Sequence, residues 1–469
     1  MKRVSSSDIF FMIYGRHVII LVGCDNMFEN NNIFILGMAR SGYEAAKVLA
    51  KRNNQILITD IKEQDAKQVE ELESLGVRVI ITDEPETLLD KSYDYVIKNP
   101  GITYEHPLVV KALKLGIKVI NEMELAYELM PKDITIIGIT GSNGKTTTTT
   151  LIYEFLKAMN LPVYIGGNIG YPLCSLIDEI KSGDILVLEI SGHQLHDMHQ
   201  FKTHISVMTN LSPVHLDFFK TYDYYKAMKT KIFQNHTKSD LAILNAGNPD
   251  VMEATDKIKS KKITFSSLVP ADAYLKNDMI YYRDEEIIST NDIRVQGKHN
   301  YENIMCAIIA SKEFGITNEI IKEVLSSFTG VEHRIEYVRK LNEREFYNDS
   351  KSTNVESTIV ALKAFTKPMI LLLGGLDRGH SFDSLTPYLT NVQHIVSLGA
   401  TANRIKEYAD SINKDCVVVK TIEEAVKVAY NISDSGDIIL LSPACASWDQ
   451  YKNFEVRGGD FKKWVEELK

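Results

Sequence analysis

Long apolar runs, clustered cysteines and an excess of positive charge are all missing from this sequence of 469 residues. No stretch approaches the roughly 18 to 20 consecutive apolar residues that a membrane-spanning helix requires, so we expect no membrane insertion. The formal net charge is -9, which argues against a broad surface for nucleic acid or anionic lipid. A local basic pocket for a small anion is compatible with that charge, and small molecules are the expected partners.

The five cysteines are scattered along the chain at positions 24, 174, 306, 416 and 445. None of them has C-x-x-C spacing, so neither a zinc site nor a disulfide framework is expected. This use of cysteine fits a reducing cytosol, and we expect a cytoplasmic monomer.

Residues 1–26 form an extension to which the sequence assigns no role. The apolar run at residues 9–22 is interrupted by Arg16 and His17, and no small-residue cleavage site follows, which does not fit a signal peptide. Met27 stands just before the first strong strand signal, so we expect it to be the natural start of translation. Mass analysis of the native N-terminus tests this, and an intact peptide beginning at Met1 would contradict it.

The chain is longer than one hydrophobic core ordinarily supports, so we expect three domains, at residues 27–130, 131–329 and 330–469. Each alternates short apolar runs with helix-length segments. This pattern predicts an α/β fold on parallel sheets, with Rossmann-like first and third domains around a phosphate-loop domain. Strands are expected at residues 33–36, 55–59, 79–81, 95–97, 134–139, 185–188, 205–208, 346–347, 369–373, 394–398, 416–419 and 438–441.

A glycine turn opens the first domain. Gly37 and Gly42 punctuate the first strand-to-helix connection, and Asp60 ends the second strand. Such a turn, followed about twenty residues later by an acidic residue, is typical of nucleotide-binding strand–helix–strand units. The middle glycine of that pattern is missing, however, and an ordinary tight turn with a strand-end aspartate explains the same residues.

The second domain contains a glycine loop between a β-branched strand and an amphipathic helix that runs through Met159. Glycines let successive backbone N–H groups converge on phosphate oxygens, and a helix N-terminus adds partial positive charge. We expect Lys145 to contact the β- and γ-phosphates of ATP and the Thr146 hydroxyl to bind magnesium. The first glycine of the general G-x-x-x-x-G-K-[ST] pattern is replaced by Ile139. The loop reads Gly141-Ser142-Asn143-Gly144-Lys145-Thr146-Thr147.

Two further strands of the second domain end in polar residues that could meet this loop. One runs into Glu189, and the other into Thr209 and Asn210 and then His215. Because the carboxyl ends of parallel strands gather ligands, Glu189 and His215 are placed to hold a metal beside the γ-phosphate. The alternative is that Glu189 is an ordinary surface residue whose carboxylate is exposed to water.

In the third domain, polar clusters at residues 348–354 and 377–380 lie between the expected strands. They are too dense in turn-forming and ionic groups to belong to a core. Either they are solvated loops or they line a site, and residue types alone favour solvated loops.

Six stretches resemble motifs of the Mur ligases, which build the peptide of bacterial cell-wall precursors. They occur in order along the chain, and the resemblance covers nearly the whole chain from Ile33 onward. It is closest to the branch of the family that adds D-glutamate, and the family's T-G-[ST]-N-G-K-[ST] loop accounts for the missing first glycine. The stretches are GITGSNGKTTTTT (138–150), GNIG (167–170), HNYEN (299–303), EHR (332–334), NDSKSTN (348–354) and LSPACASWDQYKNFEVRG (441–458).

The resemblance implies that the first domain binds the UDP part of the substrate, the second ATP, and the third the incoming amino acid. Expected contacts to the UDP-substrate are Arg40, Ser41, Asp60, Asn99, Gly101, Asn168, Ser191 and Gln194. Expected contacts to ATP, besides the glycine loop, are Asn300, Asn303, Arg334, Asp349 and Lys351. The amino acid is expected to contact Thr353, Arg378, Ser447, Trp448 and Phe454. Arg378 offers bidentate geometry to a side-chain carboxylate.

Two magnesium ions, which manganese could replace, are also implied by the resemblance. Their expected ligands are Thr146, Glu189, His215 and a carbamylated Lys229, with Lys226 and Lys231 as alternatives for the modified residue. Carbamylation turns an ammonium into an anion, which can bind a cation that a bare lysine would repel. The expected catalytic residues are Lys145, His215, Lys229 and Lys351.

The implied reaction is the ATP-dependent addition of D-glutamate to UDP-N-acetylmuramoyl-L-alanine through an acyl phosphate, with closure of the third domain over ATP. Two stretches depart from the family pattern: residues 191–195 read SGHQL in place of the usual SSFQL, and residues 376–379 read LDRG where some relatives carry a lysine. A related ligase with another acceptor, such as folate, is one alternative function. A nucleotide-dependent switch without ligase chemistry is another.

Overall fold

The structure, a computed structural model, describes residues 9–14, 17–22, 28–295 and 297–469. Met27, the expected start of translation, lies outside the described residues. Within the extension, β1 (Ile9–Tyr14) and β2 (His17–Val22) pair as an antiparallel hairpin. The chain forms two compact units, the first made of Met1–Tyr274 with Met305–Gly315 and the second of Leu275–Ile304 with Ile316–Lys469.

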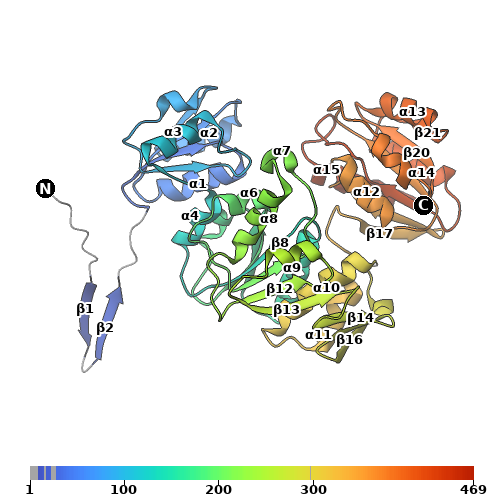
Figure 1. Ribbon diagram of the computed structural model, residues 1–469. Coiled ribbons are helices and arrows are strands. Elements are labelled where there is room, and N and C mark those ends of the chain that lie inside the picture. The colour runs from blue at the N-terminus through green and yellow to red at the C-terminus, as the bar shows by residue number, and fades with distance from the viewer. Residues whose placement is uncertain (1–8, 15–16, 23–27, 296) are drawn as a thin grey trace. The chain divides into compact units, whose positions relative to one another are not determined.

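The first unit opens with a five-stranded parallel sheet, blue in Figure 1, in the order β5-β4-β3-β6-β7. Its elements are β3 (Asn32–Leu36), α1 (Arg40–Ala50), β4 (Gln55–Asp60), α2 (Ala66–Ser74), β5 (Arg78–Ile81), β6 (Tyr95–Lys98), α3 (Pro107–Leu115), β7 (Lys118–Ile120) and α4 (Glu122–Leu129). Successive residues of β3 are buried on opposite faces, Ile33 and Ile35 with the α1 side chains and Phe34 with those of α3. Burial on both faces explains why this strand is a continuous apolar run.

A larger parallel sheet follows in the same unit, in the order β9-β10-β8-β11-β12-β13-β14. Its strands are β8 (Thr135–Thr140), β9 (Val163–Gly167), β10 (Ile185–Glu189), β11 (Ile205–Met208), β12 (Leu241–Asn245), β13 (Lys261–Ser266) and β14 (Ala273–Lys276). Its helices are α5 (Lys145–Ala158), α6 (Gly192–His196), α7 (Leu216–Phe219), α8 (Tyr222–Thr230) and α9 (Pro249–Ala254). Since β8 lies between β10 and β11, the segments that follow these three strands meet at one edge of the sheet.

The second unit contains a mixed sheet in the order β17-β18-β22-β19-β20-β21, in which β17 is antiparallel and the other strands are parallel. Its strands are β17 (Glu336–Leu341), β18 (Arg344–Asn348), β19 (Met369–Gly374), β20 (Val392–Leu398), β21 (Asp415–Val418) and β22 (Ile438–Leu441). Its helices are α12 (Val355–Lys363), α13 (Ala402–Ser411), α14 (Ile422–Ile432) and α15 (Phe454–Glu467). Earlier in the chain lie the hairpin of β15 (Met279–Tyr282) and β16 (Glu285–Ser289), then α10 (Lys298–Lys312) and α11 (Asn318–Ser327).

Strand β19 divides the core of this sheet into two layers. Its odd-numbered residues Leu371 and Leu373 belong to the cluster that includes buried residues of α12 and α13. The even-numbered Ile370 and Leu372 belong to the cluster that includes residues of α14 and α15. Helices therefore cover both faces, as in a doubly wound fold.

The α/β fold class predicted from the sequence is confirmed, but the antiparallel strands were not expected. Hairpin turns explain them. Asn342 and Glu343, which join β17 to β18, have φ values of 47° and 63°, and Arg283 and Asp284, which join β15 to β16, have 48° and 64°. Two residues at positive φ make the tight turn that joins antiparallel strands, and without glycine such a turn is hard to predict. Among the described helices, none has both the length and the apolar content that crossing a membrane demands.

Candidate active site

The glycine loop connects β8 to α5. Gly141 and Gly144 have φ values of 142° and 80°, which residues with a side chain rarely adopt. A Cβ at Gly141 would lie 2.0 Å from Thr209 Oγ1, so a larger residue does not fit there. Gly144 is the N-cap of α5, and it has no side chain that could occupy the N-terminus of the helix. This arrangement suits an anion such as phosphate.

Residues that follow β11 fix the shape of the loop. The Asn143 amide donates to Asn210 Oδ1 at 2.9 Å, and the Thr209 hydroxyl donates to the Asn143 carbonyl at 2.6 Å. The Ser142 amide donates to the Asn210 carbonyl at 2.8 Å. Thr209 and Asn210, which the sequence marked as strand-end polar residues, thus hold the loop in place before any ligand binds.

Lys145 lies over its own loop. Its Nζ donates to the carbonyl oxygens of Gly141 and Ser142, each at 3.0 Å. The ammonium is therefore at the place where the sequence predicts phosphate, and the phosphate contact itself stays a prediction. The next two residues, Thr146 and Thr147, are buried in the first turn of α5.

Three polar residues lie behind the loop: Glu189 and Thr146, which are buried, and Asn168, which is exposed. Glu189, the last residue of β10, is 2% exposed. One of its carboxylate oxygens accepts the Thr146 hydroxyl at 2.7 Å, and the other accepts Asn168 Nδ2 at 2.7 Å. Glu189 is therefore not a solvated surface residue, and the structure brings it together with two other predicted site residues.

Of the three candidate lysines at positions 226, 229 and 231, Lys229 is the one whose side chain contacts the glycine loop. Its Nζ, nearly inaccessible to solvent, donates to Thr140 Oγ1 at 3.2 Å and to the Gly141 carbonyl at 3.0 Å. Burial, and secondarily the charge of Lys145, hold the pKa of Lys229 well below its ordinary value. A neutral amine is the form that can react with carbon dioxide. Lys226 instead pairs with acidic residues including Asp223, and Lys231 donates to a distant backbone carbonyl.

His215 is exposed, unlike Glu189. It has a φ of 56° and begins the short helix α7, and its ring lies 5.3 Å from that of His193. In the described part of the chain, no three or more His, Cys, Asp or Glu side chains form a ready-made metal site. Magnesium usually takes only one or two carboxylates and completes its shell with water and substrate phosphates. The oxygen donors of Thr146 and Glu189 fit that chemistry.

The departure at residues 191–195 has a packing explanation. The His193 ring lies 4.3 Å from the Phe218 ring, so it takes part in an aromatic cluster where relatives carry phenylalanine. A Cβ at Gly192 would be 3.3 Å from Lys229 Cε, so glycine leaves room for the buried lysine. Ser191 and Gln194 form a capping box that starts α6, which fixes both predicted substrate contacts.

The predicted UDP contacts lie around the ends of β3, β4 and β6. Ser41 Oγ donates to Asn99 Oδ1 at 2.9 Å, and Asp60 Oδ2 accepts the Met38 amide at 2.8 Å. Arg40 donates to the carbonyl of Gly170 at 3.2 Å. Asp60 therefore supports the glycine turn. Gly101 is exposed beside Asn99.

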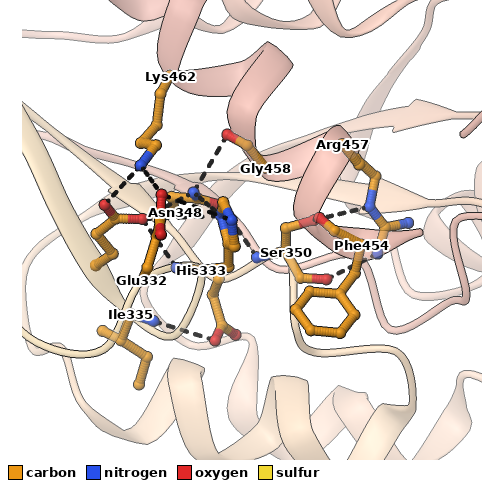
Figure 2. Close-up of polar contacts among 11 residues, drawn as sticks. Glu332, His333, Ile335, Asn348, Ser350, Phe454, Arg457, Gly458 and Lys462 are labelled. Carbon is orange, nitrogen blue, oxygen red and sulfur yellow. Dashed lines mark hydrogen bonds and ion pairs between the residues drawn. The ribbon is translucent and has the colours of Figure 1, made fainter. Parts of the chain in front are cut away.

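In the second unit, three segments converge around Asn348, as Figure 2 shows. Its Nδ2 contacts His333 Nδ1 at 2.9 Å and donates to the Gly458 carbonyl at 3.3 Å. Arg457 donates through Nε to Ser350 Oγ at 3.0 Å. The EHR segment, the segment at residues 348–354 and the start of α15 are thus joined by side-chain hydrogen bonds.

The polar cluster at residues 348–354 is largely buried. Asn348, Asp349, Ser350 and Ser352 are each less than 5% exposed, so the solvated-loop interpretation is wrong for them. Burial raises the pKa of Asp349 to about 6, although hydrogen bonds from Ser352 and Ser442 oppose that change. By contrast, residues 377–379 are exposed.

The remaining predicted ATP contacts of this unit form two pairs, one within α10 and one between Lys351 and the EHR segment. Asn303 is 5% exposed and donates to Asn300 Oδ1 at 3.5 Å, one turn away in α10. The backbone N–H of Lys351 donates to the His333 carbonyl at 2.9 Å, which places Lys351 beside the EHR segment that carries Arg334.

The predicted amino-acid contacts form two groups. Arg378 stacks on Trp448 with its guanidinium carbon 4.9 Å from the ring, and that tryptophan is 64% exposed. Ser447, which directly precedes Trp448, is 2% exposed, and its hydroxyl has no hydrogen-bond partner among the described residues. Lys351 Nζ lies 5.8 Å from the Phe454 ring, and Thr353 follows two residues later. The exposed Arg378 guanidinium suits an anionic ligand.

Comparison with known proteins decides the family. Residues 31–121 match the Mur ligase MurD-like N-terminal domain, residues 139–311 the Mur ligase middle domain, and residues 333–445 the Mur ligase glutamate ligase domain. The chain belongs to the Mur ligase family. The predicted family membership and three-domain α/β architecture are therefore confirmed, and as a member of this family the protein is a ligase.

Similar Mur ligases include two named UDP-N-acetylmuramoylalanine--D-glutamate ligase. That of Geobacillus kaustophilus (strain HTA426) is 44% identical over 447 residues, covering 94% of this chain and 99% of the relative. That of Bacillus mycoides (strain KBAB4) is 43% identical over 445 residues, covering 94% and 98%.

Solved Mur ligases share the fold at low sequence identity. The UDP-N-acetylmuramate-alanine ligase of Thermotoga maritima superposes with a TM-score of 0.58 at 19% identity, covering 94% of this chain and all of the other. The MurF ligase of the same organism, solved in complex with ADP, gives a TM-score of 0.56 at 17% identity, covering 94% and 96%.

Two buried charged residues of this Mur ligase were not predicted from the sequence. Arg457 is 2% exposed, yet its guanidinium contacts hydroxyl and carbonyl groups rather than a carboxylate. Its presence inside the matched stretch at residues 441–458 was the available signal. Lys98, directly before the predicted contact Asn99, is also buried. Neither position looks unusual in sequence, because the burial depends on segments distant along the chain.

Proposed function

We propose that this chain is the ATP-dependent ligase that joins D-glutamate to UDP-N-acetylmuramoyl-L-alanine in the cytoplasm. The observation that carries the proposal is the preassembled loop, with Lys145 over its carbonyls and the Thr146–Glu189 contact behind it. Relatives that align with 94% of the chain and bear this enzyme's name support the choice of substrates. The described cysteines are free, which fits a reducing compartment.

In the first step, a carboxylate oxygen of the alanyl group attacks the γ-phosphorus of ATP. The bond between that phosphorus and the oxygen bridging to the β-phosphate breaks, which releases ADP and leaves an acyl phosphate. Negative charge on the transferring group must be balanced, and most of the catalysis comes from positioning and charge stabilisation. We propose that Lys145 and the backbone N–H groups of the loop position the transferring phosphoryl group and stabilise its negative charge.

The residues behind the loop define how magnesium would be held. Thr146 and Glu189 offer oxygen ligands, and a carbamylated Lys229 together with His215 would serve a second ion. When bound, magnesium neutralises phosphate oxygens and orients them for transfer. Asn168 keeps the Glu189 carboxylate oriented through its 2.7 Å hydrogen bond, so this carboxylate needs no rearrangement.

In the second step, the amine of D-glutamate attacks the acyl carbon. A carbon–nitrogen bond forms, the carbon–oxygen bond to phosphate breaks, and phosphate leaves while the nitrogen loses a proton. Arg378 is proposed to bind the side-chain carboxylate of D-glutamate, since a guanidinium pairs with a carboxylate through two parallel hydrogen bonds. The Ser447 hydroxyl, which has no partner in the described part of the chain, would take a second polar group of the same ligand.

A substrate panel monitored by phosphate release tests the proposal. The purified chain, supplied with ATP, magnesium and UDP-N-acetylmuramoyl-L-alanine, receives D-glutamate, L-glutamate, L-lysine, diaminopimelate or no amino acid; a parallel reaction replaces the UDP-sugar with folate. We expect release only with the UDP-sugar and D-glutamate together. Turnover with another pair would assign a different ligase, and release without either substrate would indicate a nucleotide-dependent switch.

A further inference from the structure

A buried ion pair joins two parts of the proposed UDP-sugar site. Lys98 ends β6, and Asp197 follows α6; both side chains are 0% exposed, and Lys98 Nζ lies 2.5 Å from Asp197 Oδ2. The two residues are 99 positions apart: Lys98 lies in the five-stranded sheet, and Asp197 lies in the segment that connects β10 to β11 of the larger sheet. Charges so completely removed from water are costly to bury, so a pair of this kind is weak evidence for a purely stabilising role.

Lys98 also shapes the loop that follows it. Its Nζ donates to the Ile102 carbonyl at 2.8 Å, and the Ile102 amide donates to the Asn99 carbonyl at 3.0 Å. These bonds close a turn over residues 99–102, which contains the expected UDP contacts Asn99 and Gly101. Because the same ammonium binds Asp197, the position of this turn depends on the segment that follows α6.

Asp197 is held from its other side. Its Oδ1 lies 2.9 Å from His196 Nδ1, and His196 Nε2 lies 2.6 Å from the Tyr224 hydroxyl. The Tyr104 ring lies 4.5 Å from the His196 ring and 5.4 Å from Lys98 Nζ, which shields the ion pair from solvent. The carboxylate therefore has a fixed orientation at the end of the helix that carries Ser191 and Gln194.

We propose that the Lys98–Asp197 pair positions the UDP-sugar by fixing the turn at residues 99–102 relative to α6. Residues on that turn and residues at the start of α6 are both among the expected contacts to the UDP-sugar. Neither charge touches the substrate, so both act as positioning residues. The inference rests on the proposed function and adds residues that set affinity for one substrate.

The test replaces both charges together, because removing one alone would leave the other buried and unpaired. Lys98→Met with Asp197→Leu keeps side-chain volume while removing the tether. We expect the KM for UDP-N-acetylmuramoyl-L-alanine to rise roughly tenfold, since small displacements of binding groups have large effects. The KM values for ATP and D-glutamate should stay within about twofold, because neither binding region contains the pair.

An exposed ion pair provides the matched control. Lys51 and Asp178 also belong to the two sheet regions of this unit and lie 2.7 Å apart, but their side chains are 57% and 72% exposed. Lys51→Gln with Asp178→Asn should leave all three KM values unchanged, as expected for a surface pair. Melting curves check that each variant is folded.

Three outcomes would overturn the inference: an unchanged KM for the UDP-sugar in the folded paired variant, an equal rise in all three KM values, or the same rise in the control. Should the paired variant not fold, Asp197→Asn decides, since it keeps the shape and its amide oxygen can still accept a hydrogen bond from the Lys98 ammonium. In this variant the KM for the UDP-sugar should rise by less than the tenfold expected of the paired variant, and the KM values for ATP and D-glutamate should not change. An unchanged KM for the UDP-sugar would count against the tether. A parent chain that does not turn over these substrates would refute the proposed function instead.

Discussion

The phosphate loop of the first unit and the predicted amino-acid site of the second differ in how far they are assembled. Around the loop, the buried Glu189 carboxylate accepts hydrogen bonds from the hydroxyl of the buried Thr146 and from the side-chain amide of the exposed Asn168. At the amino-acid site, Arg378 lies on an exposed loop against an exposed Trp448. The first region has its polar groups paired, whereas the second presents groups that are still available.

This difference separates two tasks of a ligase. Charge stabilisation during phosphoryl transfer requires groups that are fixed in advance, because rearrangement during the reaction costs free energy. Selection of an incoming amino acid requires groups that can exchange water for ligand. Substitutions in the first region should therefore lower kcat, and substitutions in the second should raise the KM for D-glutamate.

The largest effect is expected for Lys145→Ala. Removing the ammonium that lies over the loop should lower kcat by at least about 10³-fold, because it stabilises charge on the transferring phosphoryl group. Calorimetry should show that binding of the UDP-sugar persists. Lys157→Ala, in the last turn of the same helix, is the control. Near-normal turnover by the Lys145 variant would refute the assigned role of the loop.

Glu189→Gln is expected to come next. The substitution keeps the shape of a side chain that contacts Thr146 and Asn168 but removes its charge, so magnesium binding should weaken. We expect kcat to fall about 10²-fold, with partial recovery at high magnesium concentration. Glu179→Gln, at an exposed position, should have no effect. An unchanged magnesium dependence would argue against Glu189 as a ligand.

In the second region, Arg378→Ala should raise the KM for D-glutamate about 10- to 100-fold and leave that for ATP unchanged, since a charge-assisted bidentate pair is lost. Arg378→Lys should recover part of the affinity. Arg283, which also lies over an aromatic ring, is the matched control for loss of an exposed arginine. Equal KM values for D-glutamate in the Arg378 variant and the parent would remove it from the site.

The smallest change is expected for Ser447→Ala. Because this buried hydroxyl has no partner among the residues that the structure describes, removing it should leave the free energy of unfolding unchanged or raise it by up to about 1 kcal/mol. The KM for D-glutamate should nevertheless rise about 2- to 10-fold.

Ser350→Ala is the control for stability. It removes a hydroxyl that donates to the Phe454 carbonyl and accepts from Arg457, so denaturant unfolding should show a free energy of unfolding lower by about 1 to 3 kcal/mol. The opposite ranking of stabilities would contradict the roles assigned to these two serines.

Most of the fold could be predicted from periodicity, because strands buried on both faces are continuous apolar runs. β19 and β22 are examples, and each lies where it was expected. β17 could not be predicted in this way. All but one of its residues are partly buried and the other is exposed, so it shows neither a continuous nor an alternating apolar pattern.

The candidate site was predictable where residues are close in sequence. The loop at 141–147 and the strand-end Glu189 carry local signals, and the structure brings Glu189 and Thr146 into contact. The burial of Asn348 and Asp349 was not predictable from residue types, because it depends on Gly458 and Ser442 about a hundred residues away. For the same reason, the contact between Lys98 and Asp197 has no signature in sequence.

The position of Trp448 gives this chain a built-in optical reporter. The sequence has only two tryptophans, Trp448 and Trp464. Trp464 belongs to α15 and is packed against the core between α14 and that helix, whereas the indole of Trp448 faces solvent under the Arg378 guanidinium. In a Trp464→Phe background, all tryptophan fluorescence would come from beside the proposed carboxylate ligand, so titration with D-glutamate could be followed by emission without any attached dye.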